Sequence, residues 1–430
     1  MILIYAHESS VRLQYICRFI FKEQLGIAYS LTTDWEGFID HDGARINYSD
    51  TDAGDHVIQV IPQGLLAESD IHPLPVTVGS WNQLPCFFET GGNFTFDIFS
   101  AIFYLITRYE EYLPYQPDKY GRYPHTSSLA YRAGFLHIPL VNFWLAAFSQ
   151  ELIAHFPELH PASPAHNILL TYDIDIAWSY KHKGLLRSIG GFLRSPSLER
   201  LKVWRKEGID PYDAYAFLHE LHHVSVLKPI YFFLVANKNG TYDKNISPRD
   251  PALQQLIRDH AARYKVGLHP SYQSNSSLDT LLEEKVKLED ISGTQITDSR
   301  QHYLKMKLPD TYTNLELAGI TDEYSMGYGT VNGFRASIAT SYDWFDVANN
   351  KITKLHIHPF CFMDSTSHFI LDQSPAEAGE ELRGYYELCK EHGLPFTCIF
   401  HNNILGTAKE FEGWQQMYSE FVTHIAATTT

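Results

Sequence analysis

The stretch that decides the fold is Asn167-Ile-Leu-Leu-Thr-Tyr-Asp-Ile-Asp175. Its first six residues form a largely apolar run, which is typical of a parallel strand buried on both faces. Alternate residues of a strand lie on one face, so Asp173 and Asp175 are expected side by side. Two carboxylates held close together favour different roles, one as a metal ligand and one as a base. A turn or helix cap after the strand is the alternative.

Strands and helices alternate from this point to the end of the chain. Several of the predicted strands end in a polar side chain, as in Val266-Gly-Leu-His269, Lys354-Leu-His-Ile-His358 and Phe396-Thr-Cys-Ile-Phe-His401. Repeated βα units predict a parallel sheet, either open or closed into a barrel. Active sites of such folds gather at the carboxyl edge of the strands. We therefore expect these side chains to meet Asp173 and Asp175.

The preceding part of the chain is predicted to be a smaller α/β domain. It contains short apolar runs separated by Gly- and Asp-rich turns, and one long helix is expected over residues 96–112. Pro161-Ala-Ser-Pro-Ala-His166 is typical of a linker. The sequence therefore predicts two domains, residues 1–160, whose role is unassigned, and residues 167–430.

Composition excludes some classes of partner. The 430-residue chain has a formal net charge of -16, which argues against nucleic acid and anionic membrane surfaces. Its five cysteines are widely spaced and form no CxxC pair, which favours reduced thiols over a disulfide framework or zinc ribbon. The first residues do not resemble a signal peptide, and no stretch reaches the length of a membrane span. A cytoplasmic protein is expected.

Several further residues could carry chemistry. His269 is a possible zinc or cobalt ligand, although a structural role is the alternative. Arg335, in Gly333-Phe-Arg-Ala-Ser337, could orient a catalytic aspartate or tie two loops together. His356, His358 and His401 are possible general acids, because imidazole titrates near neutral pH. The His-x-His spacing places His356 and His358 on one strand face, which could also form a metal pair.

From about residue 167 to its end, the chain resembles the polysaccharide deacetylase superfamily (NodB homology, carbohydrate esterase family 4). Thr171-Tyr-Asp-Ile-Asp175 matches the Asp-x-Asp form of the first family motif. His269 begins the second motif, His-x-x-x-His, but Gln273 stands at its second position. Arg335 resembles the third motif, without its proline. His358 best fits the last motif, and His401 is the other choice.

The resemblance implies a distorted (β/α) barrel, in a subgroup with an extra N-terminal domain, and a site for a divalent metal such as zinc. By this resemblance, the base is Asp173, and the residue that orients it is Arg335. The metal ligands are Asp175 and His269, with Gln273 as a weaker ligand. The proton donor is His358 or His401. The implied reaction is hydrolysis of an N-acetyl, less favourably an O-acetyl, group on a sugar or glycan precursor.

Three alternatives stay open. A degenerate member of the fold could bind a glycan or nucleotide sugar without hydrolysing it, because Gln273 is a poorer ligand than histidine. A second alternative is an amidohydrolase of a small non-glycan amide. In the third, residues 1–160 dock a partner within a glycan assembly system.

Overall fold

The computed structural model describes residues 1–182, 200, 202–203, 205, 207–225, 227–237 and 239–429. Its first part contains a four-stranded parallel sheet in the order β2-β1-β3-β4. The strands of this part are β1 (Ile2–Ala6), β2 (Tyr29–Thr32), β3 (Ala44–Tyr48) and β4 (Ile58–Gln59), with a separate hairpin of β5 (Gly79–Trp81) and β6 (Leu84–Cys86). The helices are α1 (Val11–Cys17), the π-helical η1 (Arg18–Gln24), α2 (Trp35–Ile39), α3 (Ile98–Ile106), η2 (Tyr109–Tyr112), η3 (His125–Ser127), α4 (Leu129–Arg132) and α5 (Leu140–His155).

The second part is built on a nine-stranded sheet in the order β12-β13-β11-β10-β9-β8-β7-β15-β14. All neighbouring strands are parallel except β12 and β13. The strands are β7 (Ile168–Ile174), β8 (Ile230–Phe233), β9 (Lys265–Leu268), β10 (Asp298–Ser299), β11 (Asp322–Met326), β12 (Tyr342–Asp346), β13 (Lys351–Pro359), β14 (Phe362–Met363) and β15 (Phe396–His401).

This sheet curls into a nearly closed barrel. Strand β14 lies at one edge of the sheet and β13 lies near the other edge, yet only residues 360 and 361 separate them in the chain. Three Cα–Cα steps of about 3.8 Å cover at most about 11 Å. The two sides of the sheet must therefore approach each other, which brings the carboxyl ends of the parallel strands around one opening.

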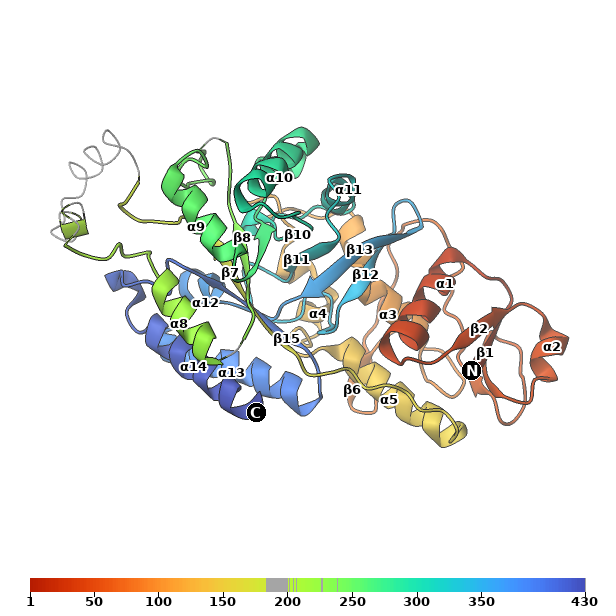
Figure 1. Ribbon diagram of the computed structural model, residues 1–430. Helices are drawn as coiled ribbons and strands as arrows, with labels where there is room; N and C mark the ends of the chain where they lie inside the picture. Colours follow the sequence, from red (N-terminus) through yellow and green to blue (C-terminus); the bar gives the residue numbers. More distant parts are fainter. Residues whose placement is uncertain are drawn as a thin grey trace.

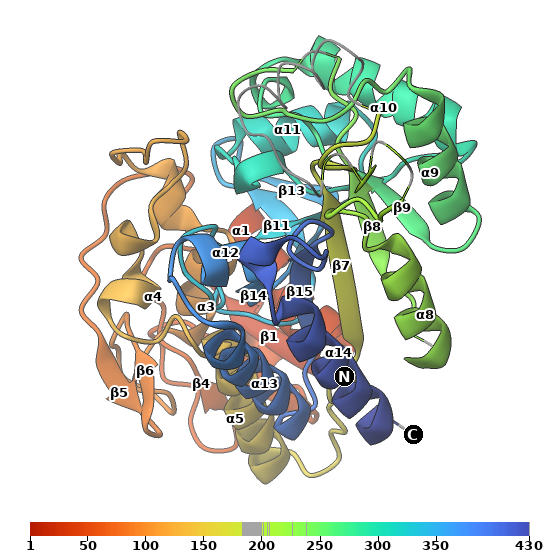
Figure 2. The same ribbon diagram turned by 90° about the vertical axis from the view of Figure 1, so that its left-hand side faces the viewer.

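Helices surround the strands. Figures 1 and 2 show α9, α10 and α11 on one side of the barrel, and α13 and α14 on the opposite side. The helices of this part are α8 (Tyr215–Ser225), α9 (Pro251–Ala261), η4 (Ser274–Ser276), α10 (Leu278–Ser292), η5 (His302–Leu304), α11 (Asp310–Leu317), α12 (Asp364–Phe369), α13 (Pro375–Glu391), η6 (Lys409–Phe411) and α14 (Trp414–Thr429). Within the described ranges, none of these or the earlier helices has the length and apolar character needed to cross a bilayer.

The predicted fold class is confirmed: a barrel-like α/β part follows a smaller α/β part. One predicted element is wrong, because the helix expected over residues 96–112 ends at Ile106. Arg108 adopts a left-handed backbone conformation with φ 56°, which breaks the helix and turns its side chain inward. There the buried guanidinium pairs with Glu110 and Glu111.

The two parts share one hydrophobic core, which runs without interruption from β1 to α14. Polar contacts also join them. Arg335 of the barrel forms a buried ion pair with Glu111 at 2.5 Å, and Arg18 pairs with Asp343 at 2.6 Å. In Figure 1 the N-terminal sheet lies on the β12–β13 side of the barrel with α1 between them, and Tyr15 of α1 packs on Phe345 of β12. The domain division at residue 160 stays a prediction.

Candidate active site

The polar residues at the carboxyl ends of the strands converge as expected. Asp173 and Asp175 come from the end of β7, His269 follows β9, and His401 ends β15. His269 Nε2 lies 3.0 Å from Asp175 Oδ1, and His401 Nε2 lies 3.8 Å from Asp175 Oδ2. Because the strands are parallel and the sheet curls, their ends bring these four side chains to one place.

A histidine that the sequence did not single out completes the centre. His302 follows the two-residue strand β10, and its Nε2 lies 3.5 Å from Asp175 Oδ2. Asp175, His269 and His302 each offer one ligand atom, and these atoms all lie within 4.8 Å of one another. One carboxylate and two imidazoles match the three protein ligands of many catalytic zinc sites, which keep a further position for water or substrate.

The hydrogen bonds of the two imidazoles fix which nitrogen faces Asp175. His269 Nδ1 donates to the carbonyl of Arg300 at 2.5 Å, and His302 Nδ1 donates to Asp243 Oδ1 at 2.9 Å. When each ring is neutral, these bonds place its proton on Nδ1, so that Nε2 carries a lone pair. Among the described residues, none forms a hydrogen bond to the buried Oδ1 of Asp175, although His269 Nε2 lies 3.0 Å away. Two nitrogen lone pairs that point toward a carboxylate form a site suited to a cation. The groups that accept from the two Nδ1 atoms, a backbone carbonyl and a carboxylate, are also the usual hydrogen-bond acceptors of metal-bound histidines.

The electrostatics of this group agree with that fit. Burial lowers the pKa of His302, but the charges of Asp175 and Asp243 outweigh burial and raise it to about 9. Burial also opposes ionisation of Asp175, yet His302 and His269 hold the pKa of Asp175 well below its usual range. The carboxylates therefore favour positive charge at the histidine nitrogens, from a proton or from a metal ion.

Asp173 has a separate set of partners. Arg300 Nη1 donates to Asp173 Oδ1 at 3.1 Å and to Thr171 Oγ1 at 2.7 Å. The other carboxylate oxygen, Oδ2, lies 3.9 Å from His269 Nε2 and 4.0 Å from His401 Nε2. Arg300 thus neutralises one side of the buried carboxylate and leaves the other side facing the centre.

His401 has its own carboxylate partner, Asp364, the first residue of α12. Asp364 Oδ1 accepts a hydrogen bond from His401 Nδ1 at 2.6 Å, and Oδ2 accepts one from the backbone N–H of His401 at 2.7 Å. Burial lowers the pKa of His401, but Asp364, with smaller contributions from Asp175 and Asp173, raises it to about 10. The imidazolium therefore holds a proton at Nε2, directed at the centre.

These groups open into a pocket of about 320 Å³. Its polar floor is formed by the residues just described, and its walls include apolar side chains of α12 and its neighbours. The lining residues outside the centre include Tyr120, Arg122, Tyr303, Met363, Phe369 and Ile370. The pocket is therefore large enough to hold a small polar group next to the centre, between aromatic and apolar side chains.

The structure places Arg335 elsewhere, which corrects the expectation that it orients Asp173. Its Nε and Nη2 donate to Glu111, and its Nη1 donates to the carbonyl of Gly327. The residue ties the barrel to the N-terminal part, which was the alternative for it. Arg300 makes the contact with Asp173 instead.

His358 also lies outside the pocket. His356 and His358 share a strand face as predicted, with ring centres 4.9 Å apart. However, the register pairs His356 with Asp322, the first residue of β11, so this part of β13 lies near the level where the parallel strands begin. His358 Nε2 donates to Asp322 Oδ1 at 2.8 Å, and its ring stacks on Tyr324. Of the two predicted proton donors, only His401 is at the centre.

Gln273 supports the centre indirectly. Its Nε2 lies 3.5 Å from Asp243 Oδ2, and Asp243 in turn accepts the hydrogen bond of His302. His302, and not Gln273, lies with Asp175 and His269 in the group that could hold a metal ion. Arg300 and His302 are the two site residues that the sequence prediction does not include. The segment Ser299-Arg-Gln-His-Tyr-Leu304, in which they stand two positions apart, is the sequence signal that could indicate them.

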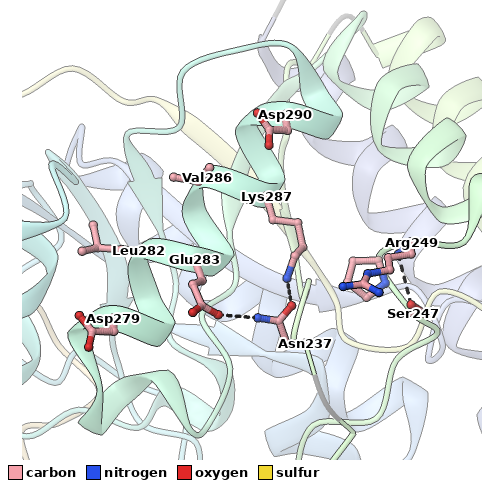
Figure 3. A pocket seen from close by; sticks show the side chains of 10 residues that line it. Asn237, Ser247, Arg249, Asp279, Leu282, Glu283, Val286, Lys287 and Asp290 are labelled. Atoms are coloured by element: carbon pink, nitrogen blue, oxygen red, sulfur yellow. Dashed lines mark hydrogen bonds between the residues drawn. The ribbon is translucent and has the colours of Figure 1, made fainter.

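A larger and more open pocket, of about 1080 Å³, lies between α10 and the loop before α9 (Figure 3). Figure 3 shows Asn237 of the lining hydrogen-bonded to Glu283 and Lys287. Leu282 and Val286 of α10 line the same pocket. Its described lining contains no histidine or cysteine, whereas His269, His302 and His401 line the smaller pocket.

Comparisons with known proteins found one family model and several similar solved structures. A family model described as a family of unknown function, DUF7033, matches residues 2–157. The sequence has no match among curated proteins.

Several solved structures are similar over 60–63% of the chain. A candidate polysaccharide deacetylase from Mycobacterium smegmatis is 15% identical, with a TM-score of 0.40, covering 63% of this chain and 89% of its own. The polysaccharide deacetylase of Bacillus cereus is 9% identical, with a TM-score of 0.31, and the match covers 60% of this chain and 88% of the Bacillus chain. The allantoinase PuuE is 12% identical, with a TM-score of 0.38, and the match covers 60% of this chain and 84% of the allantoinase chain.

Proposed function

We propose that the chain is a metal-dependent hydrolase that removes an N-acetyl, less favourably an O-acetyl, group from a sugar or glycan precursor. The observation that carries the proposal is the geometry of Asp175, His269 and His302, whose ligand atoms converge while the outer nitrogens of both imidazoles are hydrogen bonded. These three residues would hold the metal, with zinc the best match to one carboxylate and two imidazoles. The chemistry that a divalent metal supplies at such a site is a lowered water pKa and a polarised carbonyl.

Asp173 is the proposed base. Arg300 holds its Oδ1 at 3.1 Å, so Oδ2 is the atom available to take a proton from the attacking water. The pairing with a buried guanidinium orients the carboxylate. Asp173 keeps this proton while the bond between water oxygen and acetyl carbon forms.

His401 is the proposed acid. Its Nε2 proton passes to the sugar nitrogen as the carbon–nitrogen bond breaks, which releases the amine and acetate. Asp364 stabilises the imidazolium through the 2.6 Å bond at Nδ1 and directs Nε2 toward the centre. A base and an acid on two neighbouring strand ends, β7 and β15, suit the two proton transfers that amide hydrolysis requires.

His302 favours hydrolysis over the binding-only alternative. That alternative rested on Gln273 in place of a histidine ligand, and His302 supplies the missing imidazole. The amidohydrolase of a small non-glycan amide would use the same centre, so substrate profiling separates it from the proposed deacetylase. The five cysteines are free and buried, which supports our further proposal of a reducing, cytoplasmic compartment.

Elemental mass spectrometry of the purified chain tests the proposal. We expect near-stoichiometric divalent metal in the wild type and in Gln273→Ala, and its loss in Asp175→Ala and His302→Ala. Acetate release from acetylated amino sugars should follow the same order. A wild-type chain that takes up no metal even with excess zinc would contradict the proposal.

A further inference from the structure

The N-terminal part of the chain contributes two residues to the wall of the active-site pocket. Tyr120 and Arg122, which lie between η2 and η3, line it together with Asp175 and His302. The hydroxyl of Tyr272, beyond β9, donates to the carbonyl of Tyr120 at 3.1 Å and ties this loop to the barrel. The pocket is therefore incomplete without the first 160 residues.

Arg122 is held in one orientation. Its Nε donates to Asp118 Oδ2 at 2.8 Å, and its backbone N–H donates to Asp118 Oδ1 at 2.9 Å. Its guanidinium also lies over the ring of Tyr120, 4.7 Å from the ring centre. The side chain is only 8% exposed, so the surrounding residues fix where its remaining donors point.

One of those donors reaches the residue after His302. Arg122 Nη1 donates to the carbonyl of Tyr303 at 2.8 Å. Tyr303 and Leu304 have left-handed backbone conformations, with φ of 60° and 50°, which L residues rarely adopt without support. The side chain of Leu304 is anchored among Phe360, Met363 and Ile399. Arg122 thus supports the strained turn that follows His302.

Tyr120 and Tyr303 form an aromatic wall from two distant parts of the chain. Their ring centres lie 5.0 Å apart, and both rings line the pocket while staying half-buried. An aromatic ring with a polar tip suits the faces of a sugar ring, which combine C–H groups with hydroxyls. The wall adjoins His302, so a sugar packed on it would present a substituent to the centre.

We infer that the N-terminal part is a working part of the active site: Arg122 is a positioning residue for His302, and Tyr120 forms with Tyr303 the surface that binds the substrate's sugar ring. This inference rests on the proposed function and assigns a role to residues 1–160. It makes metal affinity and sugar binding depend on two different side chains of the same loop.

The role of Arg122 is tested by titrating the metal-free, full-length chain with cobalt(II) and recording the visible absorption spectrum. We expect Arg122→Gln to weaken cobalt affinity at least about tenfold and to shift the spectrum, as outer-shell changes do at metal sites. Arg122→Lys, which can still donate to Tyr303, should recover part of the affinity. Arg132→Gln, an exposed arginine of the same part of the chain, is the matched control.

Thermal unfolding of each variant identifies any that fails to fold. If Arg122→Gln does not fold, the cobalt affinity and spectrum of Arg122→Lys are compared with those of the wild type instead. Wild-type affinity and spectrum in Arg122→Gln would overturn the role of Arg122 alone. A wild-type chain that binds no cobalt would overturn both this inference and the proposed function.

The role of Tyr120 is tested by calorimetric binding of the N-acetylglucosamine tetramer, which requires no turnover. We expect Tyr120→Ala to weaken binding roughly tenfold, from the loss of one aromatic contact, and Tyr120→Phe to bind almost as the wild type does. The cobalt spectrum should be unchanged in Tyr120→Phe, which keeps the ring that packs on Arg122. Tyr131→Ala, an exposed tyrosine outside the pocket, is the control. Unchanged binding by Tyr120→Ala, or no binding by the wild type, would overturn the role of Tyr120.

Discussion

The Nδ1 atom of His302 donates a hydrogen bond to Asp243 Oδ1 at 2.9 Å, although 59 positions separate the two residues in the chain. Asp243 lies in the segment between β8 and α9, and it also accepts from the backbone N–H of Tyr272 at 2.8 Å. This carboxylate therefore links two loops and fixes the ring of His302. Burial opposes its ionisation, but the hydrogen bond from His302 lowers the pKa of Asp243 overall.

This contact predicts that Asp243→Asn lowers metal affinity by about 10- to 100-fold, because the neutral amide orients His302 less firmly and makes it a poorer donor to a metal. Competition with a chromophoric zinc chelator measures the change. Asp213→Asn, which alters a half-buried carboxylate paired with Lys181 outside the pocket, should leave the affinity unchanged. Equal affinities for Asp243→Asn and the wild type would remove Asp243 from the site.

Arg300 and Arg335 are both buried, and substitutions at them should have different effects. Arg300→Gln should lower kcat while metal content is retained, because Asp173 loses the cation that orients it. Arg335→Gln should instead lower the free energy of unfolding, by at most about 3–5 kcal/mol, because it removes one of the two buried arginines that pair with Glu111 and leaves Arg108 as the other. Its kcat per metal-loaded, folded molecule should match the wild type.

Chemical denaturation and steady-state kinetics on the same preparations separate these two effects. A loss of kcat in Arg335→Gln, with kcat intact in Arg300→Gln, would restore the role that sequence alone suggested for Arg335.

The strand-end residues of the site could be predicted because their positions follow from the chain's pattern. Asp173 and Asp175 end a long apolar run, and His269 and His401 end two others. Parallel strands bring such ends to one edge whatever the details of packing. The fold class could be predicted for the same reason.

His302 and Arg300 could not be placed from pattern alone. They follow β10, which has only two residues, too few to show a strand periodicity. Arg335 was misjudged because its partner, Glu111, lies 224 positions away in the N-terminal part. Nothing local in Gly333-Phe-Arg-Ala-Ser337 distinguishes an arginine that binds Asp173 from one that binds a distant glutamate.

The pair of Asp322 and His358 predicts a pH-dependent contribution to stability. The hydrogen bond from His358 is the main cause that lowers the pKa of Asp322 to about 2, below the roughly 3.9 of an unfolded aspartate. A lowered folded-state pKa stabilises the fold above the unfolded pKa, and this stabilisation is lost as pH falls through the folded value.

Asp322→Asn should therefore unfold at a lower temperature than the wild type at neutral pH, and the difference should shrink between about pH 4 and pH 2. Thermal unfolding followed by circular dichroism across this range measures the difference. Its kcat at neutral pH should be unchanged, because Asp322 and His358 lie outside the pocket. A gap in melting temperature that widens toward low pH would contradict the assignment.

His401 should be distinguishable from His358 by the leaving group of the substrate. His401→Gln should lower kcat on an acetylated amino sugar by about 10²- to 10⁴-fold, the usual contribution of a general acid. On 4-nitrophenyl acetate the loss should be much smaller, because nitrophenolate leaves without being protonated. His358→Gln should behave as the wild type on both substrates, since its ring contacts Tyr324 and Asp322 instead of the pocket. Metal content measured on each variant separates loss of the acid from loss of the metal, because His401 lies 3.8 Å from Asp175 Oδ2. Equal losses on the two substrates would show that His401 acts on the metal ligand Asp175 and not as the proton donor.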